Sequence, residues 1–147
     1  MPEKLLVFCG KPFVEPFSNF LEIAEIKLER VLGVTVSNNA ALDCDIISEL
    51  VAYPAGCTVV LFNPRRNSQA HVLNACRKTV TSLALAGDGK FLTTGECGHM
   101  PNVRVWDISD PQNAVQIAEF PGHKYGINCV VGNVRDNFSF YVFVFHF

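Results

Sequence analysis

A chain of 147 residues and 16.2 kDa has room for one domain. Its net charge of −2 argues against nucleic-acid binding, which needs a basic surface, and no run approaches the ~20 apolar residues that cross a membrane. Six cysteines without a Cys-x-x-Cys pair indicate free thiols in a reducing cytoplasm rather than a disulfide framework or a zinc site: Cys9, Cys44, Cys57, Cys76, Cys97 and Cys129.

Residues 1–27 are predicted to form an N-terminal extension. Within it, Ser18–Leu28 has a pattern typical of a short helix, because Asn19 and Glu22 have the spacing of a capping box. The following segment, Val31–Val36, alternates enough to predict a strand, with Gly33 inside it.

Four short apolar runs separated by turn residues predict an antiparallel meander in the next part of the chain. They lie around Leu42 and Cys44, then at Leu50–Tyr53, Cys57–Asn63 and His71–Leu73. We expect Pro54-Ala55-Gly56 to end the second of these strands.

The most informative stretch follows, with strands predicted at Thr79–Ala86, Phe91–Thr94 and Val103–Asp107. Asp88-Gly89 supplies the turn between the first two, since glycine accepts positive φ, and the third ends in the single tryptophan, Trp106, followed by aspartate. Two strands around an Asp-Gly turn and a third ending in Trp-Asp resemble one blade of a WD-repeat β-propeller.

The blade pattern recurs along the chain. Phe62-Asn63 precedes Trp106-Asp107 by 44 residues, within the roughly 40–45 residues of one such repeat. A third copy opens at Gly122-His123 and continues into a strand at Tyr125–Val131.

We therefore predict an all-β fold: a partial WD-repeat propeller with two antiparallel four-stranded blades and the start of a third. The blades are expected at roughly 28–74 and 75–119, and the third begins at 120–130. Residues 131–147 are expected to be a divergent hydrophobic tail with neither a turn before a second strand nor a Trp-Asp pair. The alternative for this tail is that it pairs as an edge strand over Val130.

Several runs narrow the resemblance to one family: LERVLGVTVS, LVAYPAGCTVVLFNP, RKTVTSLAL, GDGKFLTTGECGHMPNVRVWD and GHKYGINCV. From about Leu28 to Val130, they resemble the N-terminal part of the first propeller of the mitogen-activated protein kinase-binding WD-repeat scaffolds. This resemblance implies a non-catalytic protein-interaction segment of the Jun-kinase pathway, with protein partners and no cofactor. It also implies a cytoplasmic location, with cytoskeletal or spindle association.

The family's kinase-docking and self-association regions lie downstream of its propellers, so the resemblance assigns no partner-binding residue here. A propeller closes with about four to eight blades, and this chain holds two and a fraction. The alternative hypothesis is a truncated read-through or splice product with little autonomous function, which self-associates through its open blade edges.

Blades of this type are often held by a polar network in which a loop histidine and a strand hydroxyl satisfy the tryptophan indole. Phe62 removes the need for it in the first blade. Thr94 is placed to bind the Trp106 indole, while Cys76 stands where the histidine is expected. The residues interpreted as structural blade residues are Thr94, Trp106, Asp107, Asp88, Gly89, Gly122 and His123.

No catalytic, cofactor-binding or metal-binding residue is predicted. Cys97 and His99 leave open the remote alternative of a thiol enzyme, although a catalytic thiolate also needs an orienting third group. The basic pairs Arg65-Arg66 and Arg77-Lys78 are interpreted as solvated turns, or alternatively as a patch for an acidic partner segment.

Overall fold

The computed structural model describes residues 28–73, 75, 77–135 and 139–145 and is built almost entirely of strands. The helix predicted at Ser18–Leu28 therefore lies outside the described residues, apart from its last position. Sheet 1 has the order β1-β2-β3-β4. Its strands are β1 (Asp43–Asp45), β2 (Leu50–Ala55), β3 (Thr58–Asn63) and β4 (Ser68–Val72), preceded by the 3-10 turn η1 (Asn39–Ala41).

Sheet 2 repeats this meander with the order β5-β6-β7-β8. Its strands are β5 (Val80–Leu85), β6 (Phe91–Glu96), β7 (Val103–Asp107) and β8 (Val115–Phe120), with the 3-10 turn η2 (Pro111–Asn113) before the last. The prediction of an all-β fold with two antiparallel four-stranded blades is confirmed. The fourth strand of sheet 2 was not predicted from the sequence, because the alternation of Val115-Gln116-Ile117 is interrupted at Ala118, where the pairing with β7 shifts register.

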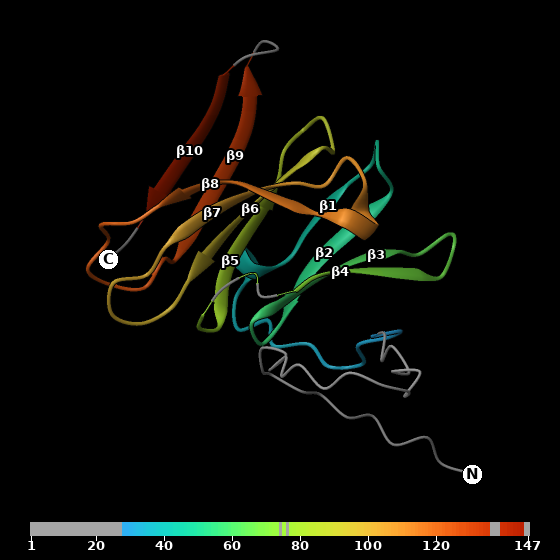
Figure 1. The fold of residues 1–147 in the computed structure, drawn as a ribbon, viewed down its shortest axis with the longest axis horizontal. Coiled ribbons are helices and arrows are strands. Elements are labelled where there is room, and N and C mark those ends of the chain that lie inside the picture. Colours follow the sequence, from blue (N-terminus) through green and yellow to red (C-terminus); the bar gives the residue numbers. More distant parts are fainter. Residues whose placement is uncertain (1–27, 74, 76, 136–138, 146–147) are drawn as a thin grey trace, which may run out of the picture.

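Sheets 1 and 2 pack face to face, and most of the described apolar core lies between them (Figure 1). Alternation along each strand sends one set of side chains into this layer. Sheet 1 contributes Leu50, Ala52, Val59, Leu61, Ala70 and Val72, and sheet 2 with its flanking residues contributes Val80, Leu83, Leu85, Leu92, Trp106 and Ile108. A hydrogen bond also joins the edge strands β5 and β1 of the two sheets, since the Leu85 N–H donates to the Asp43 carboxylate at 2.8 Å.

The opposite face of sheet 2 receives the third unit, sheet 3, which consists of β9 (Cys129–Arg135) and β10 (Ser139–Phe145). Gly95 makes this approach possible, because a Cβ there would come within 2.6 Å of the Ile127 Cγ2 atom. Ile127 is fixed by its backbone: its N–H donates to Glu96 O at 2.9 Å, and its carbonyl accepts from the Thr81 hydroxyl at 2.7 Å. The three sheets thus stack in chain order.

Two predictions about sheet 1 were wrong. Val31–Val36 is not a strand, because it makes isolated hydrogen bonds rather than a ladder: Val31 N–H to Gln69 Oε1 and Thr35 N–H to Pro54 O, both at 2.9 Å. Pro54 does not end the second strand, which continues to Ala55. Its carbonyl faces Thr35 rather than β3, so its missing N–H removes no bond from the β2–β3 ladder.

The expectation for the C-terminal tail was also wrong in one respect. β9 runs across positions 130 and 131, so the third unit does not end at 130, and β10 follows as a second strand although we expected no turn before it. The alternative interpretation of the tail is supported, since Val144 pairs with Val130 in the β9–β10 ladder. Its β-branched and aromatic sequence favours a strand even without an obvious turn signal.

Candidate interaction surface

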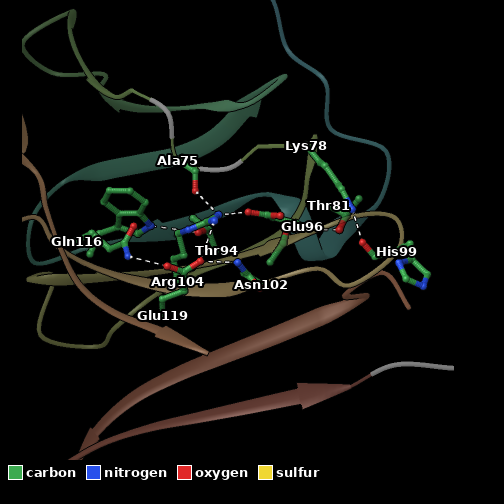
Figure 2. A network of polar contacts seen from close by, with 12 residues as sticks. Ala75, Lys78, Thr81, Thr94, Glu96, His99, Asn102, Arg104, Gln116 and Glu119 are labelled. Atoms are coloured by element: carbon green, nitrogen blue, oxygen red, sulfur yellow. Dashed lines mark hydrogen bonds and ion pairs between the residues drawn. The ribbon is translucent and has the colours of Figure 1, made fainter. Parts of the chain in front are cut away.

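A charged network lies in the layer between sheets 1 and 2 (Figure 2). The Arg104 guanidinium forms an ion pair with Glu96 and a second one with Glu119, whose Oε1 lies 3.0 Å from Nη2. The side chains of Arg104 and Glu96 are only 8% and 4% exposed, whereas that of Glu119 is 39% exposed. Buried charges of this kind are tolerated only when they are paired.

Strand register explains why these side chains meet. Arg104 on β7 stands opposite Thr94 on β6 and opposite Glu119 on β8. Glu96 lies two residues beyond Thr94, on the same face of β6. Arg104 Nη1 also donates to the carbonyl of Ala75 at 3.3 Å, which ties the connection between the two sheets to sheet 2.

The hydrogen bond expected at the tryptophan is present. Trp106 Nε1 donates to Thr94 Oγ1 at 3.1 Å, and both side chains are buried. Cys76, which replaces the expected histidine, lies outside the described residues. Within the described part of the chain, Arg104 is the neighbouring side chain that binds the Ala75 carbonyl next to that position.

The Asp-Gly turn of sheet 2 rests against sheet 1. Asp88 Oδ1 accepts from Lys90 N–H at 3.0 Å, and Gly89 adopts a φ of 67°. A Cβ at Gly89 would lie 2.5 Å from Asp45 Oδ2 and 2.9 Å from Ser48 Cβ, so the close contact between the turns requires glycine.

Asp107 ends β7 beside this turn. Its Oδ1 accepts the Ser109 N–H at 2.9 Å. This backbone bond, together with a bond from the Ser109 hydroxyl, holds the pKa of Asp107 below its ordinary value, and Lys90 adds to the effect. The carboxylate therefore fixes the start of the β7–β8 connection.

Gly122 and His123 lie at the other end of the sheet, in the connection to β9. Gly122 has a φ of 106°, which favours glycine, and His123 is half-buried. The nearby Lys124 carbonyl accepts from Met100 N–H at 3.4 Å. The predicted blade residues therefore occupy three separate places and do not form one site.

Cys97 and His99 lie in the β6–β7 connection near the same end. Cys97 is half-buried and its N–H donates to the Thr79 carbonyl at 3.1 Å, whereas His99 is exposed and its carbonyl accepts from Lys78 Nζ. No hydrogen bond between the thiol and the imidazole occurs in the described structure, and no third side chain orients the ring.

The described ranges carry no cluster of metal ligands and no long apolar helix. In these, no group of three or more His, Cys, Asp or Glu side chains is placed to hold a metal ion. The same residues include no helix of sufficient length and apolarity to cross a bilayer. None of the cysteines whose placement is described forms a disulfide: Cys44, Cys57, Cys97 and Cys129.

A cleft of about 570 Å³ opens where the turns of sheets 1 and 2 meet. Four turns contribute to it, at residues 46–49, 64–67, 87–90 and 108–114, and we call this side of the molecule the loop face. Leu50, Leu61 and Ile108 line the cleft together with polar side chains such as Gln112. The Gln112 side chain crosses between the sheets to the Gln69 carbonyl at 3.5 Å.

The edge of this cleft is apolar and basic. Ile46 and Ile47 are 91% and 75% exposed in the β1–β2 turn. Arg65 is paired with Glu49 at 3.0 Å, but the guanidinium of Arg66 has no hydrogen-bond or ion-pair partner among the described residues. The two basic pairs predicted to flank β4 lie at opposite ends of it, so they do not form one patch.

Sequence analysis missed the charged network and the cleft. The network had a signal: Arg104 shares a strand face with the buried Trp106, so it must also be buried and needs an acidic partner. No sequence pattern indicated the cleft, because the cleft depends on how the turns of two sheets meet.

Comparison with known proteins agrees with this geometry. No protein-family model matches the chain. Mitogen-activated protein kinase-binding protein 1 from Mus musculus is 58% identical over 104 residues, and WD repeat-containing protein 62 from Sus scrofa is 50% identical over 104 residues. Each match covers 71% of this chain, which spans 7% of the length of either relative.

A solved structure supports the fold independently of these relatives. A chain in the crystal structure of the mitotic checkpoint complex matches 82% of this chain with a TM-score of 0.54 and 21% identity, and 38% of that chain is covered. At 21% identity, the match supports the fold and says nothing about function. Over 71% of its length, the chain is thus a homologue of mitogen-activated protein kinase-binding protein 1 and WD repeat-containing protein 62, as the sequence resemblance predicted.

Proposed function

We propose that this chain is a non-catalytic protein-interaction segment that binds a protein of the mitogen-activated protein kinase pathway through its loop face. The cleft between sheets 1 and 2 is the observation that supports this proposal most strongly. It joins turns from two sheets, and loops on a rigid frame are the usual carriers of binding in such folds. The name of the first relative, which describes it as kinase-binding, supports the choice of pathway.

The composition of the cleft edge fits a protein partner. Arginine is enriched among the anchors that dominate protein interfaces, and Arg66, which has no side-chain partner among the described residues, lines the cleft together with the exposed Ile47. Ile47 supplies the apolar contact, and Arg66 is available for a carboxylate of the partner. Asn63 holds the Arg66 backbone, since its Oδ1 accepts the Arg66 N–H at 2.9 Å.

In this proposal the predicted blade residues position the loops and contact no ligand. They are Thr94, Trp106, Asp107, Asp88, Gly89, Gly122 and His123. Cys97 and His99 have no catalytic role, and the chain needs no cofactor or metal. By the resemblance to its family, it acts in the cytoplasm, with a cytoskeletal or spindle-associated location.

The test is a binding measurement with the full chain immobilised and a purified mitogen-activated protein kinase as the analyte. Ile47→Asp and Arg66→Glu are each expected to weaken binding at least tenfold, which corresponds to about 1.4 kcal/mol. Arg77→Glu is the matched control, because Arg77 is exposed at the far end of β4 and does not line the cleft.

Two results would refute the proposal: no binding of the wild-type chain, or equal binding by the wild type and both cleft variants. The alternative of an incomplete product with little autonomous function predicts the first of these results, together with aggregation of the purified chain.

A further inference from the structure

Sheet 3 is half the size of its neighbours. Sheets 1 and 2 each have four strands, whereas sheet 3 has β9 and β10 alone within the described residues. β10 pairs with β9 along its whole length, from Ser139↔Arg135 to Phe145↔Cys129. The other edge of β10 has no strand beside it in the described part of the chain, so its backbone groups are available for pairing.

The edges of the other sheets carry the features that normally prevent such pairing. β1 is three residues long and carries Asp43 and Asp45. β8 carries Glu119, and on β4 the carbonyl of Gln69 already accepts a hydrogen bond from Gln112. β5 is uncharged but covered by sheet 1, since its Val80 N–H donates to the Gly56 carbonyl and its Leu85 N–H donates to the Asp43 carboxylate. Short length, charge and covering contacts are the usual protections of an edge strand.

β10 has none of these protections in its sequence. Its seven residues, SFYVFVF, include no charge, proline or glycine and are rich in β-branched and aromatic types. A sequence of this kind on an open edge is the typical substrate for strand addition from another chain.

We infer that β10 pairs antiparallel with β10 of a second copy of this chain. The resulting sheet, β9-β10-β10-β9, has four strands, the number found in each of the two complete sheets. Full overlap of Ser139–Phe145 with its copy places Val142 opposite itself and Ser139 opposite Phe145. This two-fold pairing uses the open edge of β10 in both copies, so no third copy can add at β10, and the outer strands of the joined sheet are the two β9 strands.

This inference is independent of the proposed function, because it uses no residue of the cleft. Its first test is light scattering of the full-length chain after size-exclusion chromatography over a hundredfold range of concentration. A dimer that dissociates on dilution is the expected result. A monomer at every concentration would overturn the inference, and so would open-ended assembly.

Cross-linking tests the register. In a Val142→Cys variant the two introduced thiols would face each other, with Cα atoms about 5.5 Å apart, within the range of a disulfide. In the matched Ser139→Cys variant the two thiols would lie six residues apart along the strands, roughly 20 Å. An interchain disulfide is therefore expected for the first variant only, above the background of the wild-type cysteines. Equal cross-linking of both variants would reject the register.

Charge tests the same pairing without a new covalent bond. Val142→Lys and Val142→Glu are each expected to be monomeric, because like charges would stand opposite each other, and a mixture of the two should form a heterodimer. Fluorescence of Trp106, which lies in sheet 2, reports whether each variant keeps its fold. Folded variants that stay monomeric when mixed would contradict the inferred pairing.

Discussion

Replacing Arg104 by methionine should destabilise the protein strongly. The substitution keeps an unbranched stem but removes the guanidinium, which leaves the Glu96 carboxylate, 4% exposed, without its ion-pair partner. Removing one partner from a buried pair costs about 3–5 kcal/mol, because the remaining charge stays desolvated. The Ala75 carbonyl loses its bond from Arg104 in the same variant.

Two further variants separate this cost from a general packing defect. Glu119→Gln removes a partner that is 39% exposed, so the loss should stay below about 1 kcal/mol. The double substitution of Glu96→Leu with Arg104→Met removes both buried charges and should recover most of the stability lost by Arg104→Met alone, since apolar replacements of such pairs are often neutral.

Urea unfolding followed by tryptophan fluorescence measures these effects. Trp106 is the single tryptophan and lies on the same face of β7 as Arg104, so it reports on the layer between the sheets. A lower midpoint with an unchanged slope indicates a change in stability. The reasoning fails if Arg104→Met costs less than about 1 kcal/mol, or if the double variant is as unstable as Arg104→Met alone.

Three other substitutions, the first with a matched control, test separate parts of the fold. Thr94→Val leaves the buried indole N–H without an acceptor and should cost about 1–3 kcal/mol in urea unfolding. The neighbouring Thr93→Val should cost less, because the buried Thr93 hydroxyl has no hydrogen-bond partner among the described residues. Gly95→Ala should cost about 1–3 kcal/mol, because the added methyl group would overpack against Ile127. The variant should also accelerate exchange of the Ile127 amide, whose N–H donates to the Glu96 carbonyl on β6. Unchanged exchange at Ile127 would argue against the contact between Gly95 and Ile127. Burial lowers the pKa of His71 below 6.5, so the contribution of the neutral imidazole to stability is fully present above pH 6.5 and is lost as the pH falls through the folded pKa. His71→Gln should therefore flatten the decline in stability between pH 7.5 and 5.5. An equal decline in the wild type and the variant would exclude His71 as its cause.

Much of sheet 2 could be predicted from sequence, because its signals are local. The Asp88-Gly89 turn, the alternation of Val103–Asp107 and the Thr94–Trp106 hydrogen bond follow from turn chemistry, strand period and the need to satisfy a buried donor. The strand bounds were less accurate where pairing alone decides them. β4 begins at Ser68, three residues before the predicted start, because Ser68 pairs with Asn63.

The candidate interaction surface could not be predicted because its parts are distant in sequence. Ile47 and Gln112 line one cleft only because Gly89 allows the turns of sheets 1 and 2 to approach. Likewise, the alternation around Val34 suggests a strand, but whether a partner strand lies beside it is a property of the tertiary structure. The local sequence pattern therefore predicts the strands of each sheet, whereas the cleft depends on contacts between the two sheets.

The stacking of the sheets in chain order has a consequence for the order of unfolding. Within the described residues, sheet 2 alone has a neighbouring sheet on both faces, with sheet 1 on one side and sheet 3 on the other. In a stacked array, local stability follows the number of neighbours, and opening starts from the ends. The amides of β6 should therefore exchange with solvent last, and the hairpin β9–β10 can detach while sheets 1 and 2 remain packed together.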